Sequence, residues 1–181
     1  MSKKIIILNG SPRKNGNTSE LIKYFKKGVE EAGNTVTEFF LNDMNINGCL
    51  GCCRGGKNLE SPCVQKDDML KLYPAYKDAD IVVLASPLYY WTISGQLKIA
   101  FDRLFAVAEC DKNYSNPKKE SILLMAAEGN GFEESIYWYD RVMKHLHWKS
   151  LGKVLCGGVF NVGDIKDRKE LNDAYELGKQ I

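Results

Sequence analysis

Residues 5–18 read IIILNGSPRKNGNT, a short apolar run that passes directly into a polar loop with two glycines and two cations. A run of four apolar residues that ends at a turn is typical of a strand buried on both faces of a parallel sheet. The next stretch, 18–32, has the spacing of an amphipathic helix. The loop therefore joins a buried strand to the N-terminus of a helix, which is the first half of a strand–helix–strand unit.

The same alternation continues along the whole chain. Apolar runs predict strands at 81–85, 122–127 and 154–159, and a half-polar run at 35–41 suits an edge strand. Between them, amphipathic stretches predict helices at 68–77, 95–108, 132–147 and 166–179. We expect Gly33 and Asn34 to cap the end of the first helix and Pro74 to kink or split the second. The pattern predicts an α/β fold with a five-stranded, doubly wound parallel sheet between two layers of helices.

Length and composition exclude several classes of protein. The chain has 181 residues, of which 44% are hydrophobic and 27% charged, and this predicts one domain spanning residues 1–181. A net charge of +2 without a basic run argues against a nucleic-acid partner. No apolar run approaches the roughly 18 residues of a membrane helix, and the first residues do not form a signal peptide. We therefore expect a cytoplasmic chain with reduced thiols and no membrane partner.

The loop after the first strand has the composition of an anion site. Gly10 and Gly16 let the backbone approach a ligand, the helix N-terminus offers free N–H groups and a favourable dipole, and Arg13 can donate to two oxygens. We expect a phosphate there. The loop lacks the P-loop and Gly-x-Gly-x-x-Gly patterns, which argues against ATP and a Rossmann-bound dinucleotide. The alternative is a plain polar turn with Thr18 as the N-cap.

Three consecutive aromatic residues follow the third strand, in the segment Ser86-Pro87-Leu88-Tyr89-Tyr90-Trp91. In an open α/β sheet, ligands bind in the crevice at the carboxyl ends of the strands. We expect a flat conjugated ligand to lie against these rings with its phosphate on the first loop. The two sites together predict a mononucleotide with a large ring, and FMN fits best. The alternative is that the aromatic residues cover the top of the sheet or a subunit contact.

These segments together resemble a known family. The segments that carry the resemblance are the first loop, Cys49-Leu50-Gly51-Cys52 with Cys63-Val64-Gln65-Lys66-Asp67-Asp68-Met69, and Ser86–Trp91 followed by Gly95-Gln96-Leu97-Lys98 and Phe101-Asp102-Arg103. They are similar to the NADPH-dependent FMN reductase and iron–sulfur flavoprotein branch of the flavodoxin-like superfamily. The resemblance implies FMN, NAD(P)H as co-substrate, the strand order 2-1-3-4-5, and a homodimer or homotetramer with the flavin near the subunit contact.

The resemblance also implies roles for individual residues. Ser11, Arg13, Asn17 and Thr18 would hold the phosphate, and Pro87, Leu88, Tyr89, Tyr90 and Trp91 would flank the isoalloxazine ring. The loop 127–131 would approach the remaining edge of the ring. No catalytic side chain is expected, because hydride transfer belongs to the cofactor.

The function that follows is an FMN-dependent oxidoreductase that takes hydride from NAD(P)H and reduces a small acceptor such as a flavin or quinone. Two alternatives remain open at this point. One is an iron–sulfur flavoprotein that relays electrons between proteins. The other is a flavodoxin-like carrier without its own NAD(P)H turnover.

Four cysteines, Cys49, Cys52, Cys53 and Cys63, lie within fifteen positions. Iron–sulfur relatives use Cys-x-x-Cys-x-x-Cys and a later fourth cysteine. Here the third cysteine is adjacent to the second, and adjacent side chains diverge. We expect structural thiols without a metal, with an iron–sulfur cluster and a redox-active or partner-linked dithiol as the alternatives.

Overall fold

The computed structural model describes residues 2–181 and contains a five-stranded parallel sheet with the order β2-β1-β3-β4-β5. The strands are β1 (Lys4–Asn9), β2 (Thr35–Phe40), β3 (Ile81–Pro87), β4 (Glu120–Ala126) and β5 (Lys149–Cys156). The helices are α1 (Asn17–Glu31), the 3₁₀ turn η1 (Leu41–Asp43), α2 (Met69–Asp78), α3 (Gly95–Arg103), α4 (Phe105–Ala108), α5 (Glu133–Leu146) and α6 (Lys169–Lys179). The predicted fold class and strand order are confirmed.

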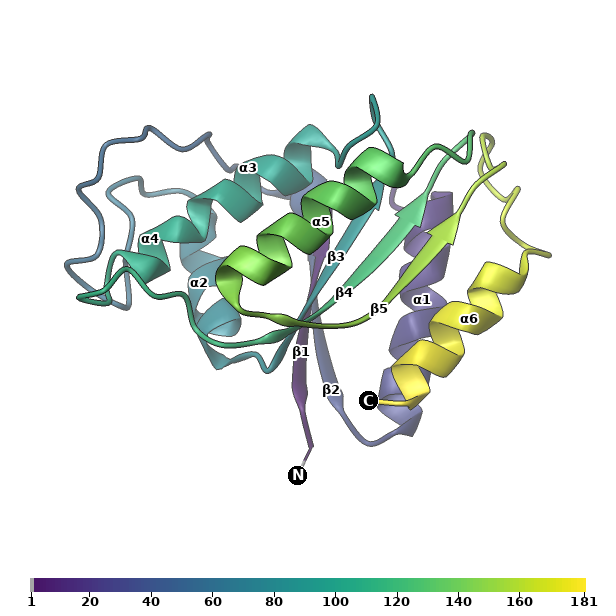
Figure 1. Cartoon of the computed structure of the whole chain (residues 1–181), viewed down its shortest axis with the longest axis horizontal. Coiled ribbons are helices and arrows are strands. Elements are labelled where there is room, and N and C mark those ends of the chain that lie inside the picture. The colour runs from purple at the N-terminus through teal and green to yellow at the C-terminus, as the bar shows by residue number, and fades with distance from the viewer. Residues whose placement is uncertain (1) are drawn as a thin grey trace.

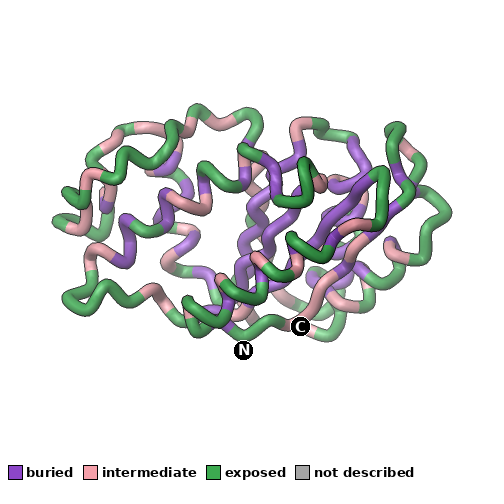
Figure 2. The backbone as a smooth tube through the Cα atoms, turned by 45° about the horizontal axis from the view of Figure 1, so that its top comes forward, coloured by how far each residue is buried: buried purple, intermediate pink, exposed green. Residues whose placement is uncertain are grey.

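Helices cover both faces of the sheet (Figure 1). Alternate residues of β1 enter different cores: Ile5 and Ile7 pack with α1 and α6, whereas Ile6 and Leu8 pack with α2, α3 and α5. Figure 2 shows the resulting buried strands between exposed outer helix faces. Both faces of the central strands are thus apolar, which explains why they form unbroken apolar runs in the sequence. No helix within residues 2–181 combines the length and apolar character needed to cross a bilayer.

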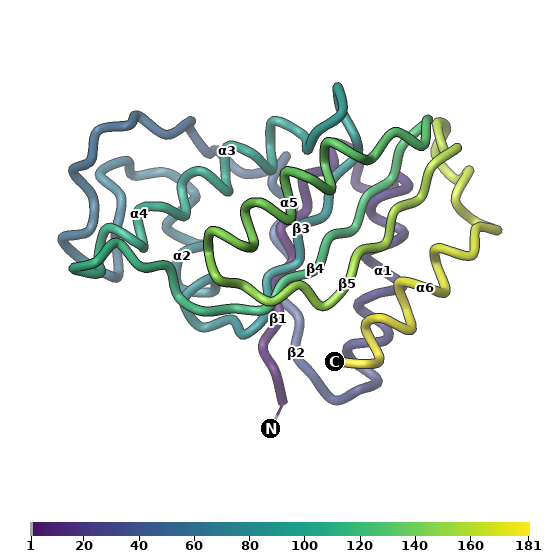
Figure 3. The backbone as a smooth tube through the Cα atoms, viewed as in Figure 1, coloured from purple at the N-terminus to yellow at the C-terminus, as the bar shows by residue number. Residues whose placement is uncertain are grey.

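Two glycines allow α1 and α6 to pack at short range. A Cβ on Gly28 would clash with the backbone carbonyl of Tyr175, and a Cβ on Gly178 would clash with that of Phe25. The two helices lie side by side on one face of the sheet in Figure 3. The backbones therefore meet directly at this crossing, which leaves no space for a larger side chain.

The predicted helix at 95–108 is wrong in one respect, because it is divided at Leu104. Its amide donates to the carbonyl of Phe101, and the amide of Val107 donates to the carbonyl of Leu104. These bonds span three residues, and such tighter turns separate α3 from α4. The apolar stripe continues across the break, which is why the sequence pattern did not reveal it.

The predicted last strand, 154–159, is displaced. β5 begins at Lys149 and ends at Cys156, where Gly157 and Gly158 follow and Gly158 takes a left-handed φ of +73°. As an edge strand, β5 exposes Lys149 and Ser150 at its start, so its first half lacks the apolar run that marks the other strands. The two glycines end the strand because they turn the chain into the loop before α6.

Pro74 does not split its helix. α2 continues from Met69 to Asp78 with Pro74 inside it, so the predicted kink or break is wrong. Pro74 is exposed, whereas Leu72, Tyr73 and Tyr76 are fully buried. The carbonyl that loses its partner can be hydrated on the outer face while the buried side chains hold the helix together. The predicted cap at the end of α1 is confirmed, since Gly33 has a φ of +81° and its amide donates to the carbonyl of Glu30.

Candidate cofactor-binding cleft

The loops that follow β1, β3, β4 and β5 meet at the carboxyl end of the sheet and enclose a cleft of about 230 Å³. Its lining comprises Ser11, Pro12, Arg13, Gly16, Asn17, Thr18, Pro87, Leu88, Tyr89, Ala126, Ala127, Glu128, Val159 and Phe160. The order of the sheet reverses between β1 and β3, and ligands bind at such a switch point in open α/β sheets. Seven of the nine residues expected at the site line this one cleft.

The β1–α1 loop is held against the β3–α3 loop by short backbone contacts. The amide of Gly10 donates to the carbonyl of Ala85 over 2.8 Å, and the Ser94 hydroxyl donates to the carbonyl of Gly10 over 2.7 Å. A Cβ on Gly10 would lie 2.6 Å from the Ser94 Oγ, so the approach requires glycine. Because Ser94 also caps α3, the two loops that build the cleft are fixed to each other.

Ser11 shapes the first loop from inside. Its buried hydroxyl accepts a hydrogen bond from the Arg13 amide and donates one to the Arg13 carbonyl, both over 3.1 Å. The Ser11 amide in turn donates to the Asn9 side chain over 3.0 Å. These local bonds keep the loop compact and leave the Arg13 side chain exposed at the rim of the cleft.

The N-terminus of α1 presents donors to the cleft. Gly16 is the N-cap and makes no side-chain bond, so the alternative in which Thr18 caps the helix is wrong. Within the described chain, the amides of Asn17, Thr18 and Ser19 donate to no protein acceptor. Unpaired N–H groups and the positive end of the helix dipole together favour a bound anion. The buried Thr18 lies in the same first turn.

The Asn17 side chain, which lines the cleft, also joins two of its loops. Its Nδ2 donates to the carbonyl of Asn161 over 2.9 Å, and its Oδ1 accepts from the amide of Gly163 over 3.2 Å. The amide group of Asn17 therefore ties the β5–α6 loop to the start of α1. Its backbone N–H remains directed to the helix terminus and is available to an anion.

The β5–α6 loop is a part of the cleft that the sequence reading missed. Val159 and Phe160 line it, and the Arg13 Nη1 donates to the carbonyl of Phe160 over 3.3 Å. The signal was present in Gly157-Gly158, because a glycine pair directly after a strand marks a backbone that turns sharply or approaches a ligand. The predicted strand at 154–159 includes both glycines, so the apolar pattern does not mark them as the start of a loop.

The three aromatic residues after β3 form a tight hairpin turn. Tyr89 and Thr92 exchange both backbone hydrogen bonds, and Tyr90 and Trp91 take left-handed φ angles of +47° and +61°. Tyr90 is 93% exposed and Trp91 is 58% exposed. Large aromatic side chains are thus held in an unfavourable backbone conformation and directed away from the core.

A second, shallower cavity of about 530 Å³ lies between this turn and the β4–α5 loop. It is lined by Leu88, Tyr89, Tyr90, Trp91, Ala127, Glu128, Gly129 and Gly131. Leu88, Tyr89, Ala127 and Glu128 also line the first cleft, so the two cavities are continuous. One molecule can therefore place an anionic end at the helix terminus and a flat apolar end against the aromatic turn. The ionisable side chains among the described residues that line the first cleft are those of Arg13, Tyr89 and Glu128.

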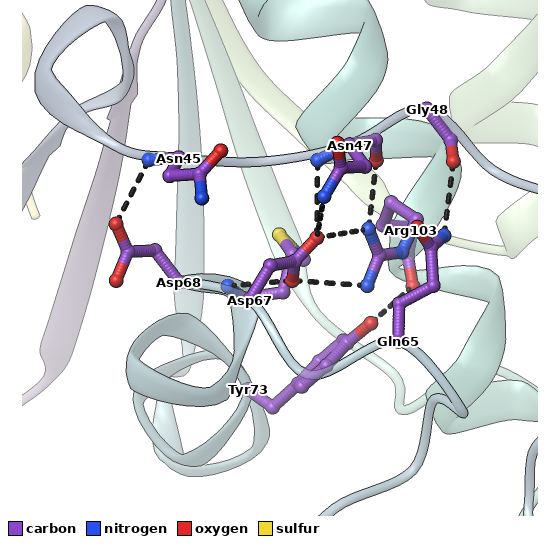
Figure 4. A network of polar contacts seen from close by, with 9 residues as sticks. Asn45, Asn47, Gly48, Gln65, Asp67, Asp68, Tyr73 and Arg103 are labelled. Carbon is purple, nitrogen blue, oxygen red and sulfur yellow. Dashed lines mark hydrogen bonds and ion pairs between the residues drawn. The ribbon is translucent and has the colours of Figure 1, made fainter.

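The long loop between η1 and α2 carries the four clustered cysteines and is closed by a buried network (Figure 4). Arg103 of α3 is 1% exposed and donates from Nη1 and Nη2 to the Asp67 carboxylate over 2.7 and 3.1 Å. It also donates to the carbonyl of Asn47, while the Asn47 amide donates to Asp67. Burial would raise the pKa of Asp67, but Arg103 and the peptide N–H groups outweigh it and lower that pKa. The ion pair therefore joins the two ends of the cysteine loop to α3.

All four clustered cysteines line a small pocket of about 60 Å³ beside α3 and α4. The Cys49 Sγ accepts from the Gly51 amide over 3.4 Å, and Cys53 takes a left-handed φ of +46°. A backbone hydrogen bond from Arg54 lowers the pKa of Cys52. Across residues 2–181, however, no three His, Cys, Asp or Glu side chains converge closely enough to hold a metal ion.

Comparisons with known proteins place the chain in a family. The sequence model of the NADPH-dependent FMN reductase family matches residues 3–157. An iron–sulfur flavoprotein of Archaeoglobus fulgidus is 32% identical over 178 residues, which cover 98% of this chain and 78% of the relative. Another iron–sulfur flavoprotein of that organism is 33% identical over 191 residues, covering 98% and 93%.

Solved structures share the fold. An NAD(P)H:quinone oxidoreductase from Methanothermobacter marburgensis superposes with a TM-score of 0.74 at 23% identity, over 99% of this chain and 96% of the other. An FMN-dependent NADH-azoreductase from Bacillus anthracis, solved in complex with FMN, superposes with a TM-score of 0.68 at 15% identity, over 98% and 96%. Because the family model matches residues 3–157, most of its length, the chain belongs to the NADPH-dependent FMN reductase family.

Proposed function

We propose that residues 1–181 form a single FMN-binding domain that takes hydride from NAD(P)H and reduces small acceptors such as flavins or quinones. Family membership makes the protein an oxidoreductase with FMN as its cofactor and NAD(P)H as co-substrate. The choice of acceptor and the residue roles are the proposal. The observation that carries it is the continuity of the anion-binding helix terminus with the aromatic turn in one cleft.

The residues present fit FMN. The unpaired amides at the start of α1, with Arg13 and the Thr18 hydroxyl, supply donors for a phosphate, and the Ser11 hydroxyl keeps their loop in shape. Pro87, Leu88 and Tyr89 line the passage from the phosphate end to the ring pocket. Tyr90 and Trp91 supply the aromatic wall, and loop 127–131 faces them.

Bound FMN would supply the redox chemistry, hydride acceptance from a reduced nicotinamide and electron transfer to the acceptor. The chain's own contribution is to orient the rings and to leave one ring face accessible. The ring pocket is shallow and open, which allows a second flat molecule to approach the side opposite the protein wall.

The experiment that tests this function is a titration of the apoprotein with FMN, followed by anaerobic addition of NADPH or NADH. We expect stoichiometric uptake, bleaching of the flavin absorbance and reoxidation by an added quinone. Uptake without bleaching would support the carrier without turnover. A chain that takes up no FMN would contradict the proposal.

Electron relay through an iron–sulfur cluster is not part of this proposal. The relatives' names imply a cluster, and the four cysteines share one pocket. Their arrangement does not fit it: Cys52 and Cys53 are adjacent in sequence, and no three thiols converge on one ion within the described residues. We expect iron and acid-labile sulfide well below four per chain in anaerobically purified protein, and four of each would reverse this conclusion.

The exposed aromatic residues at the mouth of the cleft favour an oligomer. Tyr90, Trp91 and Phe160 are each more than half exposed around the expected flavin. Exposed apolar groups that cluster on a surface mark interaction sites. We propose a homodimer or homotetramer in which a second copy covers this face, in a cytoplasmic setting that agrees with six unpaired cysteines.

A further inference from the structure

The turn at Tyr89–Thr92 is of a kind that aromatic residues rarely form. Its closing residues exchange two backbone hydrogen bonds of 2.9 and 3.1 Å, and both central residues, Tyr90 and Trp91, are left-handed. This is the geometry of a two-residue type I′ hairpin, for which Asn-Gly is the favoured pair. Bulky side chains are strained in this backbone region and persist there only where neighbouring structure enforces it.

One side chain outside the turn holds it in place. The Ser135 Oγ donates to the carbonyl of Trp91 over 2.9 Å. Ser135 lies in the first turn of α5 and is 0% exposed, and it lines neither part of the cleft. In Figure 1 the loop after β3 rises beside the start of α5, so the bond joins two segments far apart in sequence.

The start of the turn is fixed separately. The amide of Leu88 donates to the carbonyl of Ala126 over 3.0 Å, which continues the β3–β4 pairing to the base of the hairpin. The far side, at the Trp91 carbonyl, has the Ser135 hydroxyl as its side-chain partner within the described chain. Loss of this bond would leave the strained Trp91 held only by the Tyr89–Thr92 backbone bonds, while the base of the turn stays in the sheet.

We propose that Ser135 is a positioning residue for the flavin, because its hydrogen bond keeps the Tyr90–Trp91 turn strained and thereby holds both rings on the wall of the ring pocket. The inference rests on the proposed function, since it requires the FMN ring to occupy that pocket. Ser135 contacts neither cofactor nor substrate. It acts through the conformation of Trp91.

The first test compares Ser135→Ala with a matched control, Ser121→Ala. Ser121 is also 0% exposed, and its hydroxyl bonds the Tyr139 hydroxyl of the same helix over 2.7 Å, away from the cleft. We expect Ser135→Ala to weaken FMN binding about three- to tenfold, the range expected for one hydrogen bond. It should also raise the fluorescence of bound flavin, whereas Ser121→Ala should leave both unchanged.

The second test asks whether the effect depends on the strain. In a Tyr90→Asn, Trp91→Gly background, the turn has the pair favoured for its geometry and needs no external support. Urea unfolding of the apoproteins should show that Ser135→Ala lowers stability in the parent chain and much less in this background.

The outcomes separate the two claims. Equal FMN binding and fluorescence in Ser135→Ala and Ser121→Ala would overturn the positioning role while FMN binding by the parent chain stands. An equal loss of stability in both backgrounds would overturn the link to the strained turn. Failure of the parent chain to bind FMN would overturn the proposed function and the flavin role of Ser135 together.

Discussion

Single side chains at the rim of the cleft have different tasks, although they stand close together in the sequence. Arg13 is exposed and directed along the rim, whereas the Asn17 side chain is occupied with the β5–α6 loop. The residue types of the phosphate loop could be read from the sequence. The partner of Asn17 could not, because Asn161 lies 144 positions away and only the fold brings the two together.

Arg13→Ala tests the phosphate site. The guanidinium can form a charged hydrogen bond to a phosphate, so its loss should weaken FMN binding by about 1.5–3 kcal/mol. Lys14→Ala is the matched control, because Lys14 is ion-paired with Asp43 and lies outside the cleft lining. Titration of both apoproteins with FMN measures the difference. Equal affinities would remove Arg13 from the phosphate site.

Asp67→Asn tests the buried ion pair that closes the cysteine loop. The change leaves the buried Arg103 without its carboxylate and should lower the free energy of unfolding by about 3–5 kcal/mol. In the parent chain, the lowered pKa of Asp67 stabilises the fold above the carboxyl's ordinary pKa, and this stabilisation is lost as the pH falls through the lowered value.

Urea unfolding between pH 3 and 7 measures both effects. Asp102→Asn serves as the control, since Asp102 pairs with Lys98 on the exposed face of α3. A similar loss in the two variants would contradict a special role for the buried pair.

At the scale of elements, patterns of apolar residues located the strands and helices where both faces or one stripe were buried. They failed at the edge strand β5, whose first half is exposed or only partly buried, and at the break between α3 and α4, which the apolar stripe crosses. The strained turn at Tyr90–Trp91 was also beyond the sequence, because it depends on Ser135 from another helix. Apolar patterns in the sequence indicate which residues are buried. They do not reveal a partly exposed strand, a break within a continuous apolar stripe, or a turn that depends on a residue of another helix.

The α1–α6 crossing gives a test at this scale. Gly28→Ala places a methyl group against backbone atoms of α6 and should destabilise the fold by about 1–3 kcal/mol despite the better helix propensity of alanine. Gly95→Ala is the control, because nothing lies within 4 Å of its Cβ position at the start of α3. Thermal unfolding that finds the two variants equally stable would contradict the close crossing.

Lys119 closes the C-terminal end of α2 and gives a pH test. Its Nζ donates to the carbonyls of Lys77 and Ala79 and lies 5.1 Å from the centre of the Tyr76 ring. Burial lowers the pKa of Lys119 to about 8, with Asp80 opposing the change. The unfolded chain therefore binds more protons between pH 8 and 10.5, and stability should rise over that interval.

We expect a rise of about 1–2 kcal/mol between pH 8 and 10. Burial raises the pKa of Tyr73 and Tyr76. Above pH 10 these two side chains ionise in the unfolded chain before they ionise in the folded one, so the free energy of unfolding falls. Lys119→Met should remove the rise and keep the later fall. Chemical unfolding of both proteins from pH 7 to 11 measures this, and identical profiles would contradict the assignment to Lys119.

At the scale of the whole molecule, the doubly wound sheet explains why one cleft carries the function. Its order reverses between β1 and β3, so the phosphate loop and the aromatic turn follow neighbouring strands. The alternation of strands and helices made this architecture predictable. This alternation does not predict the position of the cysteine loop. A buried ion pair to α3 fixes that loop beside α3 and α4, away from the cleft.

The most direct test of the account is the absorption spectrum of the FMN-loaded protein under argon, before and after addition of NADPH and, separately, NADH. We predict a flavin spectrum with one FMN per chain that bleaches with at least one of the two nicotinamides and returns when a quinone is added. A protein that remains colourless with excess FMN, or a bound flavin that neither nicotinamide bleaches, would contradict the account.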